Sequence, residues 1–227
     1  MMCSTKTKHH LRQYIPNKPH KWGVKLFVLC DTNDFANRFE IYNGAGDNVI
    51  LPNTPDLGTT SNIVMRLSQT IPDFVHHILY FDNFYTSLPL LVYLRARGIY
   101  SLGTVRANRI PGCKVRKESR GFSTEYMTSV QGIDLNTVLW KNIKCLCLTS
   151  TYVGIEPFLR ANPDLQTAKV SRYDRKQKHF IEINCPQIIR EYNAHMGGVD
   201  LMDSLMGRYH IQAKSRNIIM RVQTCTC

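Results

Sequence analysis

Three aspartates stand where they could perform metal-dependent phosphoryl transfer. Asp31 ends the apolar run at residues 24–30, Asp82 ends a second run at residues 78–81, and Asp200 lies on a later helical pattern. In-line phosphoryl transfer uses two metal ions about 3.5–4 Å apart, one at each reacting oxygen. Magnesium prefers carboxylate oxygens as ligands. Two carboxylates at strand ends and a third on a helix therefore predict a site for two Mg²⁺ or Mn²⁺ ions.

Each aspartate also has a simpler interpretation. Taken singly, Asp31 and Asp82 are typical turn residues, because short carboxylates hydrogen-bond nearby backbone. Asp203 follows Asp200 by three residues on roughly the same helix face, as a fourth acid or as a solvated charge. Three carboxylates without a cation would repel one another, so cation binding and assembly of the site should be coupled.

The first elements predicted around these acids are strands. Residues 22–30 form a short, mostly apolar run bounded by turn residues, which indicates a buried strand. Residues 35–42 alternate as the returning arm of a hairpin, and residues 49–51 could be a third short strand. A helix is expected to begin at Ser61, a residue type common at the N-cap, and to end before Pro72.

The remaining pattern alternates strands and helices. A strand at 77–81, a helix from Pro89 to Gly98 and a strand at 100–105 follow in order. The pattern from 107 to 185 is irregular, with strand candidates at 137–140 and 146–153. Helical periods return after Pro186 and after the Gly197-Gly198 pair. This order predicts an α/β, ribonuclease-H-like mixed sheet with flanking helices and an insertion before the closing helices.

The charge favours a polyanionic partner. The 227 residues carry 29 Lys+Arg against 17 Asp+Glu, a formal net charge of +12. Nucleic acid is the leading candidate, an anionic membrane the second, and a merely basic protein the plain alternative. Two clusters of cations suit phosphate contacts whose strength falls with salt. The predicted DNA-binding residues are Arg106, Arg109, Lys114, Arg116, Lys117, Arg120, Arg172, Arg175, Lys176 and Lys178.

The cysteines, histidines and apolar runs predict a soluble intracellular protein without zinc. Eight cysteines show no disulfide-like spacing, and no secretory signal opens the chain. Cys225 and Cys227 form a lone CxC motif that lacks two partner ligands. The two pairs of consecutive histidines, His9-His10 and His76-His77, also lack further ligands. The longest apolar stretch, residues 88–94, is too short to cross a bilayer, so no membrane association is expected.

Several longer sequence motifs, spread over roughly residues 12–216, resemble those of the piggyBac transposase family. They are Tyr-Ile-Pro-Asn-Lys-Pro at 14–19, the strand ending in Cys30-Asp31, Tyr-Phe-Asp-Asn-Phe-Tyr-Thr-Ser at 80–87, Gly-Thr-Val-Arg at 103–106, Arg-Tyr-Asp-Arg at 172–175, and the stretch 192–203. The resemblance implies a DDE/D recombinase with Asp31, Asp82 and Asp200 in its three catalytic, metal-binding positions. It further implies DNA as substrate, nicking by water, a hairpin intermediate, joining to TTAA targets, and a nuclear location.

The resemblance also implies parts that we expect to be missing from this sequence. Family members carry a DNA-binding and dimerisation region ahead of residue 14 and further helices after residue 216, so we expect a truncated copy whose homodimer contacts are missing. The predicted division is a lead-in at 1–21, the front of the core at 22–106, the insertion at 107–185, closing helices at 186–216 and a divergent tail at 217–227. The alternative function is a non-catalytic, domesticated DNA- or chromatin-binding protein.

Overall fold

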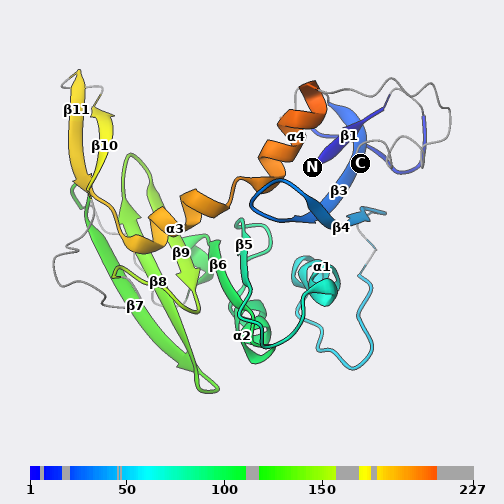
Figure 1. The fold of residues 1–227 in the computed structure, drawn as a ribbon, viewed down its shortest axis with the longest axis horizontal. Helices are drawn as coiled ribbons and strands as arrows, with labels where there is room; N and C mark the ends of the chain where they lie inside the picture. The colour runs from blue at the N-terminus through cyan, green and yellow to red at the C-terminus, as the bar shows by residue number, and fades with distance from the viewer. Residues whose placement is uncertain are drawn as a thin grey trace. The chain divides into compact units, whose positions relative to one another are not determined.

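The computed structural model describes residues 1–5, 8–16, 21–44, 46, 48–110, 118–156, 169–174 and 178–208. The chain divides into two compact units, Met1–Ile71 with Met196–Cys227 and Pro72–His195. Each unit is described by itself below, with the element labels of Figure 1.

The first unit is built on one long central strand. Its elements are β1 (Met2–Ser4), β2 (Arg12–Tyr14), β3 (Trp22–Cys30), β4 (Ala36–Ile41), α1 (Thr59–Leu67), the 3-10 helix η1 (Ser68–Thr70) and α4 (Gly198–Arg208). Strand β3 pairs antiparallel with β1 and β2 through its first half and with β4 through its second half. The predicted strand at 22–30 and its returning arm are confirmed.

The segment after β4 differs from its prediction. Residues 49–51 form no strand, and Val49 and Ile50 are 54% and 44% exposed. The carbonyl of Val49 instead accepts a 2.6 Å hydrogen bond from the Arg66 guanidinium, which also forms an ion pair with Glu40 of β4 at 2.8 Å. This tertiary contact uses a backbone group that a sheet ladder would need, so the apolar triplet stays irregular.

Helix α1 begins two residues earlier than predicted. Its N-cap is Gly58, which has a φ of 88° and therefore a conformation that favours glycine. Ser61, the predicted N-cap, is buried within the helix. The helix ends at Leu67 and continues as η1 to Thr70, so the predicted stop before Pro72 is confirmed.

The second unit contains a mixed five-stranded sheet, seen in green in Figure 1. Its elements are β5 (Ile78–Phe81), α2 (Leu88–Ala96), β6 (Tyr100–Thr104), the 3-10 helix η2 (Ala107–Arg109), β7 (Ser123–Val130), β8 (Ile133–Lys141), β9 (Cys145–Ser150), β10 (Lys169–Asp174), β11 (His179–Asn184) and α3 (Gln187–His195). The sheet order is β5-β6-β9-β8-β7, with β5 and β6 parallel and the other pairs antiparallel. The strands predicted near 77–81, 100–105, 137–140 and 146–153 are confirmed.

The segment assigned by sequence to an insertion shares this sheet. Strands β7, β8 and β9 extend it from the edge of β6, and β10 pairs with β11 in a separate hairpin. The alternation of apolar and polar residues along β7 is weak, because β7 is an edge strand whose second half is exposed. The five-part division of the chain stays a prediction.

Helix α3 covers one face of the sheet. Ile188 and Ile189 are almost fully buried against Leu102, Val138 and Leu148. Trp140 belongs to the same core, and its indole nitrogen donates a 2.9 Å hydrogen bond to the carbonyl of Asn184. Burial of a large aromatic with its one donor satisfied favours a single packing arrangement. No helix in the described part of the chain is long and apolar enough to span a membrane.

Candidate active site

Asp31 lies immediately after β3 and shapes the turn that follows. Its Oδ1 atom accepts hydrogen bonds from the backbone N–H groups of Asn33 and Phe35, both at 2.9 Å. Its own N–H donates to the carbonyl of Phe35 at 3.0 Å. The side chain is exposed, and no hydrogen bond of the described residues uses Oδ2. The turn therefore orients the carboxylate while leaving one oxygen for a cation.

Asp82 follows β5 with a similar side-chain arrangement. Its Oδ1 accepts the N–H of Phe84 at 3.0 Å, two residues along, as Oδ1 of Asp31 does from Asn33. Its carbonyl accepts a 2.7 Å hydrogen bond from the Thr86 hydroxyl and 3.2 Å bonds from the N–H groups of Tyr85 and Thr86. The Asp82 carboxylate is exposed at the end of a rigid turn. Both turns were predicted, and both are confirmed.

Gly103 on the neighbouring strand makes room for this turn. A Cβ at Gly103 would clash with Thr86 Oγ1 and lie 2.8 Å from the carbonyl oxygen of Phe81. Thr86 is 1% exposed, so its side chain has no alternative position in solvent. No role for Thr86 or Gly103 was predicted from the sequence, although both belong to the motifs that resemble the family.

Replacing Thr86 with valine is expected to destabilise the fold by about 1 kcal/mol, because valine keeps the volume but removes the hydroxyl that donates to Asp82. Urea unfolding of both proteins measures the difference. Thr70→Val is the matched control, since the Thr70 hydroxyl also donates to a carbonyl, Leu67, but the residue is exposed. Equal losses in the two variants would contradict a special role for the Thr86 hydroxyl.

Asp200 lies in the first turn of α4, within the same unit as Asp31. Gly198, the first residue of α4, is buried against the end of β3. A Cβ there would clash with the carbonyl oxygen of Asp31 and lie 3.1 Å from the Cys30 sulfur. Gly198 therefore makes the close approach to the end of β3, whereas a Cβ at Gly197 would meet no atom within 4 Å beyond its chain neighbours. Asp203 is half-buried one turn further along.

The charges at the two strand ends alter the pKa of neighbouring side chains. Burial and the carboxylates of Asp31 and Asp34 raise the pKa of the Cys30 thiol to about 11. Burial and the charge of Asp82 raise the pKa of Tyr85 well above its ordinary value. Both side chains therefore stay neutral at physiological pH.

The histidine nearest to Asp200 in sequence has a packing role. The ring of His195 stacks on Tyr80 with centroids 5.0 Å apart, and its Nδ1 lies 2.9 Å from the carbonyl of Glu191. The Tyr80 hydroxyl in turn lies 3.2 Å from that of Tyr152. Tyr80 lies on β5, two residues before Asp82. The alternation of side chains along a strand could therefore have indicated from the sequence that Tyr80 lies on the same face of the strand as Asp82. This cluster fixes the end of α3 to β5.

The predicted DNA-binding cations have different surroundings. Arg106 and Lys178 are exposed, as phosphate contacts require. Arg109 is exposed but also donates a 2.7 Å hydrogen bond to the carbonyl of Asn83, next to Asp82. Arg120 is half-buried, with hydrogen bonding to Asn142 and an ion pair with Asp174 at 3.9 Å. Arg172 is half-buried on β10, and Lys114, Arg116, Lys117, Arg175 and Lys176 lie outside the described residues.

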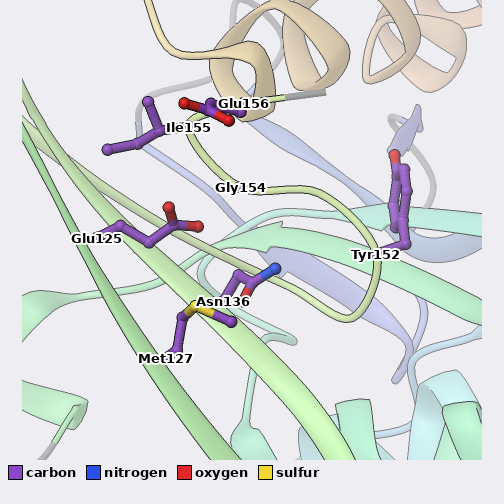
Figure 2. A pocket seen from close by; sticks show the side chains of 7 residues that line it. All are labelled: Glu125, Met127, Asn136, Tyr152, Gly154, Ile155 and Glu156. Carbon is purple, nitrogen blue, oxygen red and sulfur yellow. The ribbon is translucent and has the colours of Figure 1, made fainter. Parts of the chain in front are cut away.

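A separate cavity of about 350 Å³ lies in the second unit (Figure 2). It is lined by Glu125, Met127, Asn136, Tyr152, Gly154, Ile155 and Glu156. Burial, together with the charge of Glu156, raises the pKa of Glu125, although a hydrogen bond from the Ile155 backbone opposes this shift. None of the residues predicted from the sequence to act in catalysis or DNA binding lines this cavity.

The chemistry of the three aspartates suits a hard divalent cation. Asp31, Asp82 and Asp200 are exposed carboxylates. Two of them are held by their own turns through Oδ1, and no hydrogen bond within the described residues uses their Oδ2. Such oxygens fit magnesium or manganese. Among the residues that the structure describes, no three histidine, cysteine, aspartate or glutamate side chains gather closely enough to hold a metal ion. Asp31 and Asp200 belong to the first unit and Asp82 to the second.

The mixed sheet and flanking helices belong to the ribonuclease-H-like class of transposase folds. One solved structure, the cryo-EM structure of a piggyBac transposase synaptic complex with hairpin DNA, superposes with a TM-score of 0.71 at 23% identity. The superposed region covers all of this chain and 43% of the solved chain. At this identity the likeness establishes the fold, and the predicted fold class is confirmed.

A family model described as Transposase IS4 matches residues 1–225, and the chain belongs to this family, that of the piggyBac transposases. PiggyBac transposable element-derived protein 3 of Homo sapiens is 28% identical over 222 residues, covering 92% of this chain and 34% of the relative. PiggyBac transposable element-derived protein 2 of Homo sapiens is 24% identical over 223 residues, covering 94% and 35%. The chain thus spans about a third of the length of these relatives.

Proposed function

We propose that this chain is the catalytic part of a piggyBac-type transposase that cleaves and joins DNA strands with divalent cations. Asp31, Asp82 and Asp200 are the proposed catalytic carboxylates, with Asp203 as a candidate fourth. The observation that carries the proposal is the shared arrangement of Asp31 and Asp82, each exposed directly after a strand with Oδ1 fixed by the backbone two residues on. Membership of the family supports the same assignment.

The chain's own residues supply position and charge. The turns after β3 and β5 hold the Asp31 and Asp82 carboxylates before any ligand arrives, which reduces the entropy lost on binding. Gly198 lets the first turn of α4, and with it Asp200, approach the end of β3. Magnesium or manganese held by these carboxylates would activate the attacking oxygen and neutralise charge on the leaving one. The carboxylates would otherwise repel a phosphodiester.

DNA is the proposed substrate, and the nucleus the proposed location. The related solved transposase is a complex with hairpin DNA. This chain carries a net charge of +12, and Arg106 and Lys178 present exposed cations. Phosphate contacts of this kind release counterions, so the affinity should fall steeply with salt concentration. In a longer protein the active assembly would be a homodimer.

Thermal unfolding with added magnesium or manganese tests the carboxylate site. At a cation concentration one hundred times Kd, linkage adds about 2.7 kcal/mol of stability. For a chain of this length that raises Tm by about 5–10 °C. Asp82→Asn should lose this rise because it removes a charged ligand but keeps the side-chain volume.

Asp134→Asn is the matched control, since Asp134 is an exposed acid elsewhere on the second unit. It should keep the cation-dependent rise. A cooperative transition that ignores both cations in the unsubstituted protein would contradict the proposed catalytic function, and salt-sensitive DNA binding alone would then favour a non-catalytic DNA- or chromatin-binding protein.

A further inference from the structure

The hairpin of β10 and β11, yellow in Figure 1, has one packed face and one open face. Val170 and Ile181 pack against the core to which Ile183 also belongs. Because side chains alternate along a strand, Tyr173 and Phe180 lie on the opposite face. They are directly paired across the hairpin and are 48% and 69% exposed.

The two exposed rings form a single aromatic surface. Their centroids are 5.4 Å apart, with the rings inclined at 70°. The packed face already attaches the hairpin to the unit, with help from the Arg120–Asp174 ion pair. Tyr173 and Phe180 are therefore not needed to bury the hairpin, and their faces are accessible to a ligand.

The charge around these rings favours a polyanion over an apolar protein surface. From residue 169 to residue 184 the sequence has five Lys or Arg (169, 172, 175, 176 and 178) and two acids (174 and 182). Lys178 is exposed two residues before Phe180, whereas Lys169 forms an ion pair with Glu182 at 3.9 Å. A flat aromatic surface beside a cation matches a nucleic acid strand, which presents π-faces and phosphates together.

We propose that Tyr173 and Phe180 bind unpaired DNA bases by stacking, with Lys178 contacting the adjacent phosphate. This inference rests on the proposed DNA substrate and adds a preference for unpaired strands. Stacking requires a base whose face is accessible, so duplex DNA would be bound through phosphates alone at this hairpin.

Fluorescence anisotropy with labelled oligonucleotides tests the proposal. A thymidine strand of about 12 nucleotides is compared with an abasic strand of the same length, which keeps the phosphates and removes the bases. The unsubstituted chain should bind the thymidine strand about 5- to 100-fold more tightly. The double variant Tyr173→Ala, Phe180→Ala should lose this preference and bind the abasic strand unchanged.

Two control variants separate stacking from damage to the hairpin. Tyr173→Phe with Phe180→Tyr keeps both rings and should keep the preference. Ile143→Ala removes an apolar side chain that is 70% exposed elsewhere in the unit, and should change neither affinity. A preference that survives the double alanine variant overturns the proposal, and so does an equal loss of affinity for both strands.

The same titration distinguishes failure of the inference from failure of the proposed function. Salt-sensitive binding without a preference for bases would overturn stacking and leave the DNA substrate supported. If the unsubstituted chain binds neither strand nor duplex DNA, the proposed function fails, and the stacking proposal fails with it.

Discussion

Alanine at Asp31, Asp82 and Asp200 together is expected to slow cation-dependent DNA cleavage by at least about a thousandfold. Metal-assisted charge stabilisation supplies several kcal/mol to a phosphoryl-transfer transition state, and about 4 kcal/mol corresponds to a factor of a thousand. DNA binding should stay the same or tighten slightly, because the change removes three negative charges from a surface that meets phosphates.

The measurement is cleavage of a labelled DNA substrate with magnesium and with manganese, beside anisotropy titrations of the same DNA. Single Asp→Asn variants at the three positions should each approach the triple variant, since residues that act as a unit are not additive. Asp134→Ala, an exposed acid outside the set, should cleave normally. Cleavage that persists in the triple variant would refute the assignment.

The positions of two of these acids could be predicted from sequence because local rules decide them. A short apolar run followed by a turn residue places Asp31 after β3 and Asp82 after β5. The turn contacts are local as well, since Oδ1 bonds to N–H groups two to four residues away. In the described part of the chain the hydrogen bonds that both Oδ1 atoms accept are local, so pattern and structure agree at these two positions.

Long-range contacts decided what the pattern could not. Residues 49–51 have the apolar composition of a strand. The carbonyl of Val49 nevertheless accepts a hydrogen bond from Arg66 on α1, 17 residues away. The close approach of Thr86 to Gly103 joins a turn to a neighbouring strand and leaves no periodic signal. Sequence spacing alone could not reveal either contact.

The roles of the individual basic residues also could not be predicted from the sequence. Net charge predicts that a polyanion is favoured, but it cannot separate a phosphate contact from a structural hydrogen bond. Arg120 and Arg109 donate to Asn142 and to the Asn83 carbonyl, whereas Arg106 and Lys178 are exposed cations without such a contact in the described structure. Among these four residues, Arg106 and Lys178 are therefore the better candidates for contacting DNA phosphates.

Alanine at Gly198 is expected to destabilise the first unit by about 1–3 kcal/mol, the usual cost of overpacking a filled site. The new Cβ would clash with the carbonyl oxygen of Asp31, so α4 must shift away from the end of β3. Asp200, two residues along, would move with the helix. Displacing a catalytic group by about 1 Å can cost about a hundredfold in rate, so cleavage should fall further than stability alone explains.

Gly197→Ala is the matched control one residue earlier. A Cβ at Gly197 would meet no atom within 4 Å beyond its chain neighbours, and neither glycine has a positive φ, so alanine fits at position 197 without strain. That variant should leave stability within about 1 kcal/mol of the unsubstituted chain, or raise it by restricting the unfolded state. Urea unfolding and single-turnover cleavage of both variants check the pair. Equal behaviour of the two alanines would mean that contact between α4 and β3 does not position Asp200.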